Sequence, residues 1–120
     1  MANEQGLPIV LVVDDNTDLR DGMVAWIEDH GFQAVAAANG VEALAYLSRG
    51  LRPCLIVLDL RMPEMDGWEV LRRLKGQGEL SAIPVVVVSA EEDRPRDVTY
   101  FLRKPFDGGA LMRIIRSHRT

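Results

Sequence analysis

The sequence predicts an α/β fold in which a doubly wound, five-stranded parallel sheet carries helices on both faces. Short, uninterrupted apolar runs such as 10–13, 55–58 and 85–88 indicate strands that are covered on both sides. Segments with apolar residues at helical spacing alternate with these runs, which is the pattern of βαβ units with right-handed crossovers. Polar side chains follow several of the runs directly. In such a sheet the carboxyl ends of the strands share one edge, and ligands bind there.

The first half of the chain is predicted to hold two strands and two helices. Residues 8–13 are almost entirely apolar and form the first strand, while the weaker run 32–37 suits an edge of the sheet. Asn16 or Thr17 can cap the first helix, which Gly31 is placed to end. Asn39 and Gly40 begin the second. The residues expected on the inner faces are Leu19, Met23, Trp26, Ile27 and His30 in the first helix, and Val41, Leu44 and Leu47 in the second.

The second half of the chain continues the alternation. Strands are expected at 55–58 and 83–88, with a helix at 67–75 between them that Gly76 and Gly78 end. Residues 100–102 supply a fifth strand, and Asp107 caps the last helix. The inner faces of these two helices are expected to carry Val70, Leu71 and Leu74 in the first, and Leu111, Ile114 and Ile115 in the last.

Composition predicts one cytoplasmic domain over residues 1–120. A hydrophobic content of 48% and a charged content of 27% are ordinary for a globular protein. No run approaches the roughly 18 apolar residues of a membrane span, and the polar N-terminus is no secretory signal. Cys54, the single cysteine, is expected to be a buried bystander. A net charge of -4 argues against nucleic acid as the main partner and favours a protein.

Three carboxylates are predicted to meet at the C-terminal edge of the sheet. Asp14 and Asp15 follow the first strand, and Asp59 follows the third. The first two alone have an ordinary explanation, because negative charge is favoured at a helix N-terminus. Three carboxylates in one place repel each other unless a cation neutralises them, and Mg2+ prefers such oxygen ligands. A Mg2+ site therefore accounts for all three.

Asp59 is the residue that we expect to act as a nucleophile. A carboxylate can attack phosphorus to give an aspartyl phosphate, and a metal ion orients it and neutralises charge. Phosphoryl transfer then needs donors and cations aimed at the phosphoryl oxygens. Ser89, at the end of the fourth strand, can supply a hydroxyl, and Lys104, after the fifth, can supply an ammonium.

These residues stand in motifs that resemble the receiver domain of two-component response regulators. The most specific stretch is 58–69, LDLRMPEMDGWE, which is similar to the phosphoacceptor loop of that family. The run 9–16, IVLVVDDN, and the later motifs 88–90, VSA, and 102–106, LRKPF, are similar to its other conserved sites. The resemblance extends from the first strand to the last helix and implies a flavodoxin-like strand order of 2-1-3-4-5.

The resemblance implies a role for each site residue. Asp59 would accept a phosphoryl group from a phosphohistidine on a sensor histidine kinase or a histidine phosphotransfer protein. Asp15 and Asp59 would bind Mg2+ directly, with the main-chain carbonyl of Arg61 as a further ligand and Asp14 acting through water. Ser89 and Lys104 would contact the phosphoryl group, and the Lys104–Pro105 bond would be cis, which proline permits.

The resemblance also implies a conformational switch and a docking surface. In the switch, Ser89 moves toward the phosphoryl group and the ring of Phe101 turns inward. Arg61 and Glu91, two residues after the acceptor and the hydroxyl, are expected to tune the lifetime of the phosphoryl group. The residues expected to contact a kinase or phosphotransfer protein, by family analogy, are Arg20, Met23, Val24 and Phe106.

One segment departs from the family. Only 14 residues separate Ser89 from Lys104, and the deficit falls where the family has its helix between the fourth and fifth strands. Residues 91–98 are charged, contain Pro95 and have hardly any apolar face, so we expect at most one or two helical turns there. The surface through which receivers usually dimerise or meet an output domain should therefore have another shape.

Two other functions are compatible with parts of the sequence. A receiver-like interaction module that signals without phosphorylation fits the shortened segment, although such a module has no physical need for three clustered carboxylates. A small hydrolase with an aspartate nucleophile is suggested by the run 13–17, VDDNT, which is similar to haloacid-dehalogenase phosphatases. A chain of 120 residues leaves little room for the substrate pocket of such an enzyme.

Overall fold

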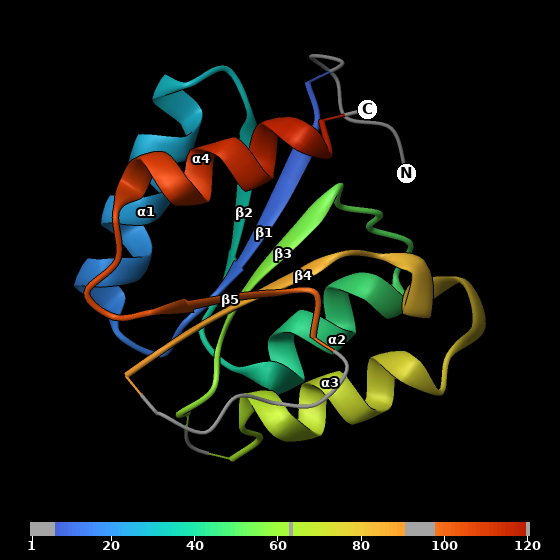
Figure 1. The fold of residues 1–120 in the computed structure, drawn as a ribbon. Coiled ribbons are helices and arrows are strands. Elements are labelled where there is room, and N and C mark those ends of the chain that lie inside the picture. The colour runs from blue at the N-terminus through green and yellow to red at the C-terminus, as the bar shows by residue number, and fades with distance from the viewer. Residues whose placement is uncertain (1–6, 63, 91–97, 120) are drawn as a thin grey trace.

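A computed structural model describes residues 7–62, 64–90 and 98–119 as a five-stranded parallel sheet flanked by helices (Figure 1). The strand order is β2-β1-β3-β4-β5, as the resemblance implied. In chain order the elements are β1 (Ile9–Val13), α1 (Thr17–Asp29), β2 (Gln33–Ala37), α2 (Gly40–Ser48), β3 (Leu55–Asp59), α3 (Gly67–Lys75), the 3-10 helix η1 (Gly78–Ala82), β4 (Val85–Ser89), β5 (Tyr100–Arg103) and α4 (Gly108–Ser117).

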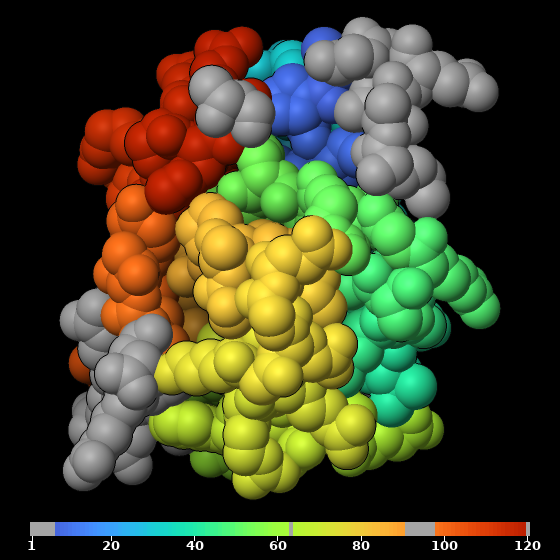
Figure 2. Space-filling model, turned by 90° about the vertical axis from the view of Figure 1, so that its right-hand side faces the viewer, coloured from blue at the N-terminus to red at the C-terminus, as the bar shows by residue number. Residues whose placement is uncertain are grey.

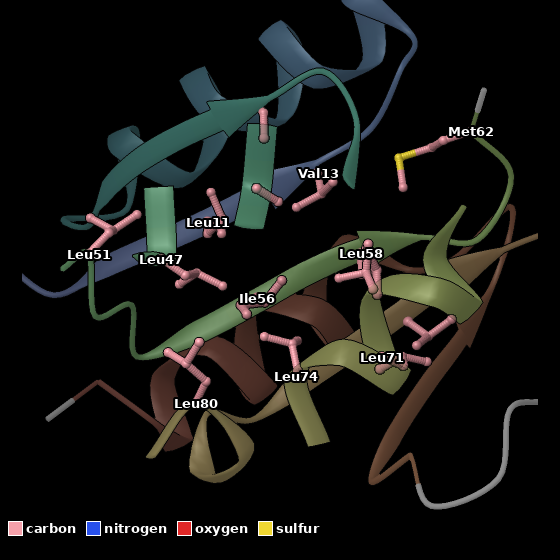
Figure 3. Close-up of a cluster of buried hydrophobic side chains, with 14 of the residues drawn as sticks. Leu11, Val13, Leu47, Leu51, Ile56, Leu58, Met62, Leu71, Leu74 and Leu80 are labelled. Atoms are coloured by element: carbon pink, nitrogen blue, oxygen red, sulfur yellow. The ribbon is translucent and has the colours of Figure 1, made fainter. Parts of the chain in front are cut away.

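The sheet separates two apolar layers. Alternate residues of the central strands point to opposite faces, so Leu11 and Val13 pack with α2 and α3, while Val10 and Val12 pack with α1 and α4. Figure 3 shows the first layer, in which Leu47 of α2 and Leu74 of α3 lie against the sheet. Every residue of β1 and β3 is buried, which explains why their sequences are apolar without alternation.

Each of the four α-helices among the described residues has a side chain that caps its N-terminus. Asn16, Asn39, Asp66 and Asp107 each accept a hydrogen bond from a main-chain N–H in the first turn of the helix that follows. These caps satisfy donors that have no partner within the helix. The strand and helix positions predicted from the sequence agree with the structure to within about two residues, which is the ordinary uncertainty of element ends. No residue pattern predicted η1.

The inner faces predicted for α1 and α2 were partly wrong. Leu19 and Val41 are about half exposed, at 53% and 49%, and His30 is exposed as well. Helix α2 approaches α3 through Gly40, where an added Cβ would lie 2.5 Å from Val70 Cγ2, and this close contact turns Val41 toward solvent. Helix α1 buries only Ile27 completely, and Leu19 in its first turn lines a surface groove together with Met23 and Phe106.

The segment in which a shortened helix was expected, 91–98, lies outside the described residues except for Val98. The label α4 accordingly denotes Gly108–Ser117, the last helix among the residues that the structure describes. Figure 2 shows the side of the molecule on which η1 and the start of β4 reach the surface beside β5 and α4. Within the described ranges, no helix has the length and apolar character needed to cross a membrane. Cys54 is partly buried, and this burial raises the pKa of its thiol, which disfavours the thiolate.

Candidate functional site

The three predicted carboxylates lie together at the C-terminal edge of the sheet. Asp14 and Asp15 directly follow β1, and Asp59 is the last residue of the adjacent strand β3. One oxygen from each lies within 4.8 Å of the others. Asp14 and Asp59 are buried, with exposed fractions of 4% and 7%, whereas Asp15 faces solvent. The cluster is thus open on one side.

Lys104 brings the ammonium group to this cluster. Its Nζ lies 3.6 Å from Asp14 Oδ2 and 3.8 Å from Asp59 Oδ1. The main-chain N–H of Lys104 donates to the carbonyl of Ser89 at 2.9 Å, which continues the pairing of β5 with β4. The Lys104–Pro105 peptide bond is cis. One lysine ammonium against three carboxylates leaves the cluster with net negative charge, which suits a hard divalent cation.

Asp14 is held at four atoms. Its N–H donates to the carbonyl of Ala37 at 3.1 Å, and its own carbonyl accepts from Arg20 Nη1 at 3.0 Å. Its Oδ1 accepts from the N–H of Asn16 at 2.9 Å, while Oδ2 faces Lys104. The loop between β1 and α1 is therefore fixed by main-chain contacts as well as by charge.

Asp59 is a carboxylate whose ionised form is disfavoured. Burial raises its pKa above the ordinary value of an aspartate, and the charges of Asp14 and Asp15 act in the same direction. The Lys104 ammonium and a long hydrogen bond of 3.5 Å from the N–H of Arg61 to Asp59 Oδ1 oppose this effect. A bound cation would favour the ionised form that a nucleophile needs.

Gly67 lets the start of α3 lie directly against Asp59. Its N–H donates to the carbonyl of Leu60 at 2.9 Å. A Cβ at this position would lie 2.6 Å from the carbonyl oxygen of Asp59 and 2.8 Å from the Cα of Leu60. Because these are main-chain atoms, they cannot move aside cheaply, so glycine fixes the distance between α3 and the end of β3.

Ser89 and Phe101 occupy different positions relative to this cluster. Ser89 ends β4, next to β3, and is fully buried. Phe101 pairs with Val87 in the register of β4 and β5, and it packs partly buried on the same face as α2 and α3. Glu91, which was expected to tune the lifetime of the phosphoryl group together with Arg61, lies outside the described residues.

Comparisons with known proteins agree with this geometry. A family model described as the response regulator receiver domain matches residues 10–116. The chain belongs to this family. It is 34% identical over 116 residues to the polar-differentiation response regulator DivK of Brucella anthropi, with coverage of 91% of this chain and 94% of DivK. It is 32% identical to the protein PilH of Pseudomonas aeruginosa, with coverage of 90% and 94%.

A solved receiver structure extends the agreement to three dimensions. The response regulator receiver protein from Pseudomonas putida is 33% identical and gives a TM-score of 0.84, with coverage of 92% of this chain and 96% of that chain. The protein is thus a receiver domain of two-component signalling, with a CheY-like fold.

Two contacts of this receiver site were missed by sequence reasoning. The main-chain N–H of Asn16 binds Asp14, and the guanidinium of Arg20, expected only as a docking residue, reaches back to the Asp14 carbonyl. A signal for the second contact was present, because a long cationic side chain in the first turn of a helix can reach the loop that precedes it. The sequence did not show which atom it would contact.

Proposed function

We propose that this receiver accepts a phosphoryl group on Asp59 and that the acidic cluster binds the Mg2+ ion that this chemistry needs. The observation that carries the proposal is the position of Asp59: it is buried, within 4.8 Å of two more carboxylates, and 3.8 Å from the Lys104 ammonium. A carboxylate trio of this kind without a bound cation disfavours its own ionisation.

In the proposed reaction, a carboxylate oxygen of Asp59 forms the new bond to phosphorus while the bond from phosphorus to the donor breaks. The donor leaves with the electron pair, as an imidazole from phosphohistidine or as acetate from acetyl phosphate. A bound Mg2+ supplies positive charge at the phosphoryl oxygens and orients the carboxylate. The residues that would hold it are Asp14, Asp15 and Asp59, with the main-chain carbonyl of Arg61 as a further ligand.

The remaining residues have supporting roles in the proposal. Lys104 already lies between Asp14 and Asp59, so its ammonium is placed to pair with a phosphoryl group on Asp59. Ser89 ends the strand beside Asp59 and is proposed to donate its hydroxyl to the same group. Movement of Ser89 would leave space that the partly buried ring of Phe101 fills, which makes these two residues the proposed switch.

The proposed phosphodonor is a sensor histidine kinase or a histidine phosphotransfer protein. A largely apolar groove of about 310 Å³ lies between α1 and the start of α4, lined in part by Leu19, Met23, Trp26 and Phe106. Leu19 is 53% exposed there, which suits burial against a partner helix. Met23 and Phe106 were expected at this surface from the sequence. Val24, like Met23 and Phe106, packs partly buried against the core on the α1 side, but it is not among the residues that line the groove.

Intact mass after incubation with acetyl phosphate tests the proposal without a partner protein. The wild-type chain with Mg2+ should gain one phosphoryl adduct, and the adduct should be absent in EDTA and in Asp59→Asn. Asp21→Asn is a matched control, because Asp21 is exposed on α1 and lies outside the cluster. An adduct that persists in Asp59→Asn would refute the assignment of the acceptor. Mg2+ binding without an adduct would favour an interaction module that signals without phosphorylation.

A further inference from the structure

We propose that Arg20 is a positioning residue for the metal-binding carboxylate of Asp15, and that it acts through the peptide that joins Asp14 to Asp15. This inference rests on the proposed Mg2+ site. Its central observation is the hydrogen bond of 3.0 Å from Arg20 Nη1 to the main-chain carbonyl of Asp14. Arg20 touches neither the phosphoryl group nor the metal in this role.

The Asp14 carbonyl has a special position among the contacts of this loop. The N–H, Oδ1 and Oδ2 of Asp14 are directed by Ala37, Asn16 and Lys104 respectively. These contacts fix the Asp14 side chain and the peptide before it, and the Asn16 contact also spans Asp15, but none of them holds the Asp14 carbonyl oxygen itself. Because a peptide group is planar, a donor that holds the Asp14 oxygen also sets the direction of the N–Cα bond of Asp15.

Asp15 depends on this main-chain direction more than its neighbours do. It is exposed, whereas Asp14 and Asp59 are buried. Only three residues, 14–16, connect the end of β1 with the start of α1. The carboxylate of Asp15 reaches the cluster when its Cα–Cβ bond points to the sheet edge, and rotation of the preceding peptide carries it away. Arg20 opposes that rotation.

Arg20 also has a rigid base from which to act. Its N–H donates to the Asn16 carbonyl at 2.9 Å as part of the first turn of α1, and the Asn16 side chain accepts from the N–H of Leu19 at 3.0 Å. The capped turn fixes the Cα of Arg20 relative to the loop. The guanidinium then spans from the helix back to the strand end, and its hydrogen bond is partly buried.

A positioning role and simple electrostatic repulsion predict opposite changes in Mg2+ affinity when Arg20 is removed. A guanidinium near a divalent cation repels it, so removal of the charge alone would strengthen Mg2+ binding. Removal of a residue that orients a ligand weakens binding, and loss of such outer contacts commonly costs about 10–100-fold in metal affinity. The direction of the change in Mg2+ affinity therefore separates the two effects.

The test is isothermal titration calorimetry of Mg2+ into the unphosphorylated chain, with the melting temperature in EDTA measured alongside. Arg20→Gln should bind Mg2+ about 10-fold more weakly. Arg20→Lys, which keeps a cationic donor of different shape, should fall between Arg20→Gln and wild type. Arg116→Gln removes an exposed arginine from the last turn of α4 and should leave the affinity unchanged. Asp15→Asn should lose most of the affinity.

The outcomes distinguish this inference from the proposed function. An affinity of Arg20→Gln equal to or tighter than wild type overturns the positioning role, even where a lower melting temperature shows a structural role. If Arg20→Gln does not fold, Arg20→Lys decides: weaker binding supports the role and unchanged binding overturns it. Wild type that fails to bind Mg2+ overturns both proposals. Normal Mg2+ binding in Arg20→Gln together with a normal phosphoryl adduct in wild type overturns the inference alone.

Discussion

Asp59 shows how the environment of one residue links chemistry to stability. The carboxyl is buried beside two other acids, and both conditions raise its pKa in the folded state. The folded protein therefore binds this proton more tightly than the unfolded chain does. The resulting contribution to stability is fully present below the unfolded pKa and is lost as the pH rises through the folded pKa. Ionisation of this side chain therefore opposes folding.

This sign predicts that Asp59→Asn has a higher free energy of unfolding than wild type at pH 7.5 in EDTA. The gain should shrink as the pH is lowered toward the ordinary range of a carboxyl, because Asp59 then becomes neutral in wild type as well. Urea denaturation at several pH values measures the effect. Asp21→Asn, at an exposed position, controls for loss of charge alone. A less stable Asp59→Asn at pH 7.5 would contradict the direction of the pKa shift.

Glu64 is a residue in a strained backbone conformation. Its φ is 68°, and it is the one residue other than glycine with positive φ among those that the structure describes. This region costs an L-residue roughly 1–2 kcal/mol relative to the right-handed region. Glu64→Gly should thus raise the free energy of unfolding by about 1 kcal/mol, while Glu64→Ala, which keeps the Cβ, should change it little. Equal effects of the two variants in urea denaturation would argue against strain.

At the scale of the elements, strands were easier to predict than helix faces. The strands β1, β3 and β4 are short, continuous apolar runs. Such a run indicates a strand that is buried on both faces of the sheet. A helix face depends on how closely the neighbouring element approaches. The exposure of Val41 follows from the contact of Gly40 with Val70, a distance that periodicity does not contain.

Two glycine positions test how strongly the close approach of neighbouring elements limits the side chain, and alanine is expected to have opposite effects at them. Gly67→Ala places a Cβ against main-chain atoms of Asp59 and Leu60, so we expect a loss of about 3 kcal/mol in the free energy of unfolding. Gly22→Ala is the matched control. An added Cβ there meets no atom within 4 Å in the interior of α1, and alanine should stabilise the helix by about 1 kcal/mol.

Chemical denaturation of both variants measures these changes, and the acetyl phosphate reaction shows whether Gly67→Ala also displaces Asp59. If Gly67→Ala proves as stable as wild type, the close approach of α3 to β3 is not required. A destabilised Gly22→Ala would mean that α1 carries a contact at this position that the structure does not show.

At the scale of the whole molecule, topology explains why the site could be predicted. Asp14, Asp59, Ser89 and Lys104 are far apart in sequence, but each lies at or just after the C-terminal end of a strand in one parallel sheet. The order of the elements therefore brings them together regardless of loop details. The contact of Arg20 with the Asp14 carbonyl depends on the path of a three-residue loop, and no residue pattern specifies that path.

The same cluster should couple folding to Mg2+. A ligand that binds only the folded state at 100 times its Kd adds about 2.7 kcal/mol, or roughly 10 °C in Tm for a chain of this length. Without Mg2+, the Lys104 ammonium is the cation that partly neutralises the negative charges of Asp14 and Asp59.

Lys104→Gln should accordingly lower the free energy of unfolding in EDTA by roughly 2 kcal/mol, because two buried carboxylates lose their ammonium partner. The Tm in EDTA should fall with it. It should also enlarge the rise in Tm on Mg2+ addition, because the metal then neutralises charge that the lysine no longer does. Differential scanning calorimetry with and without Mg2+ measures both changes, and Arg116→Gln, at an exposed position in α4, is the control. An equal Mg2+ shift in Lys104→Gln and wild type would show that the ion and the ammonium do not share these carboxylates, and the acidic edge would then be no metal site of the proposed kind.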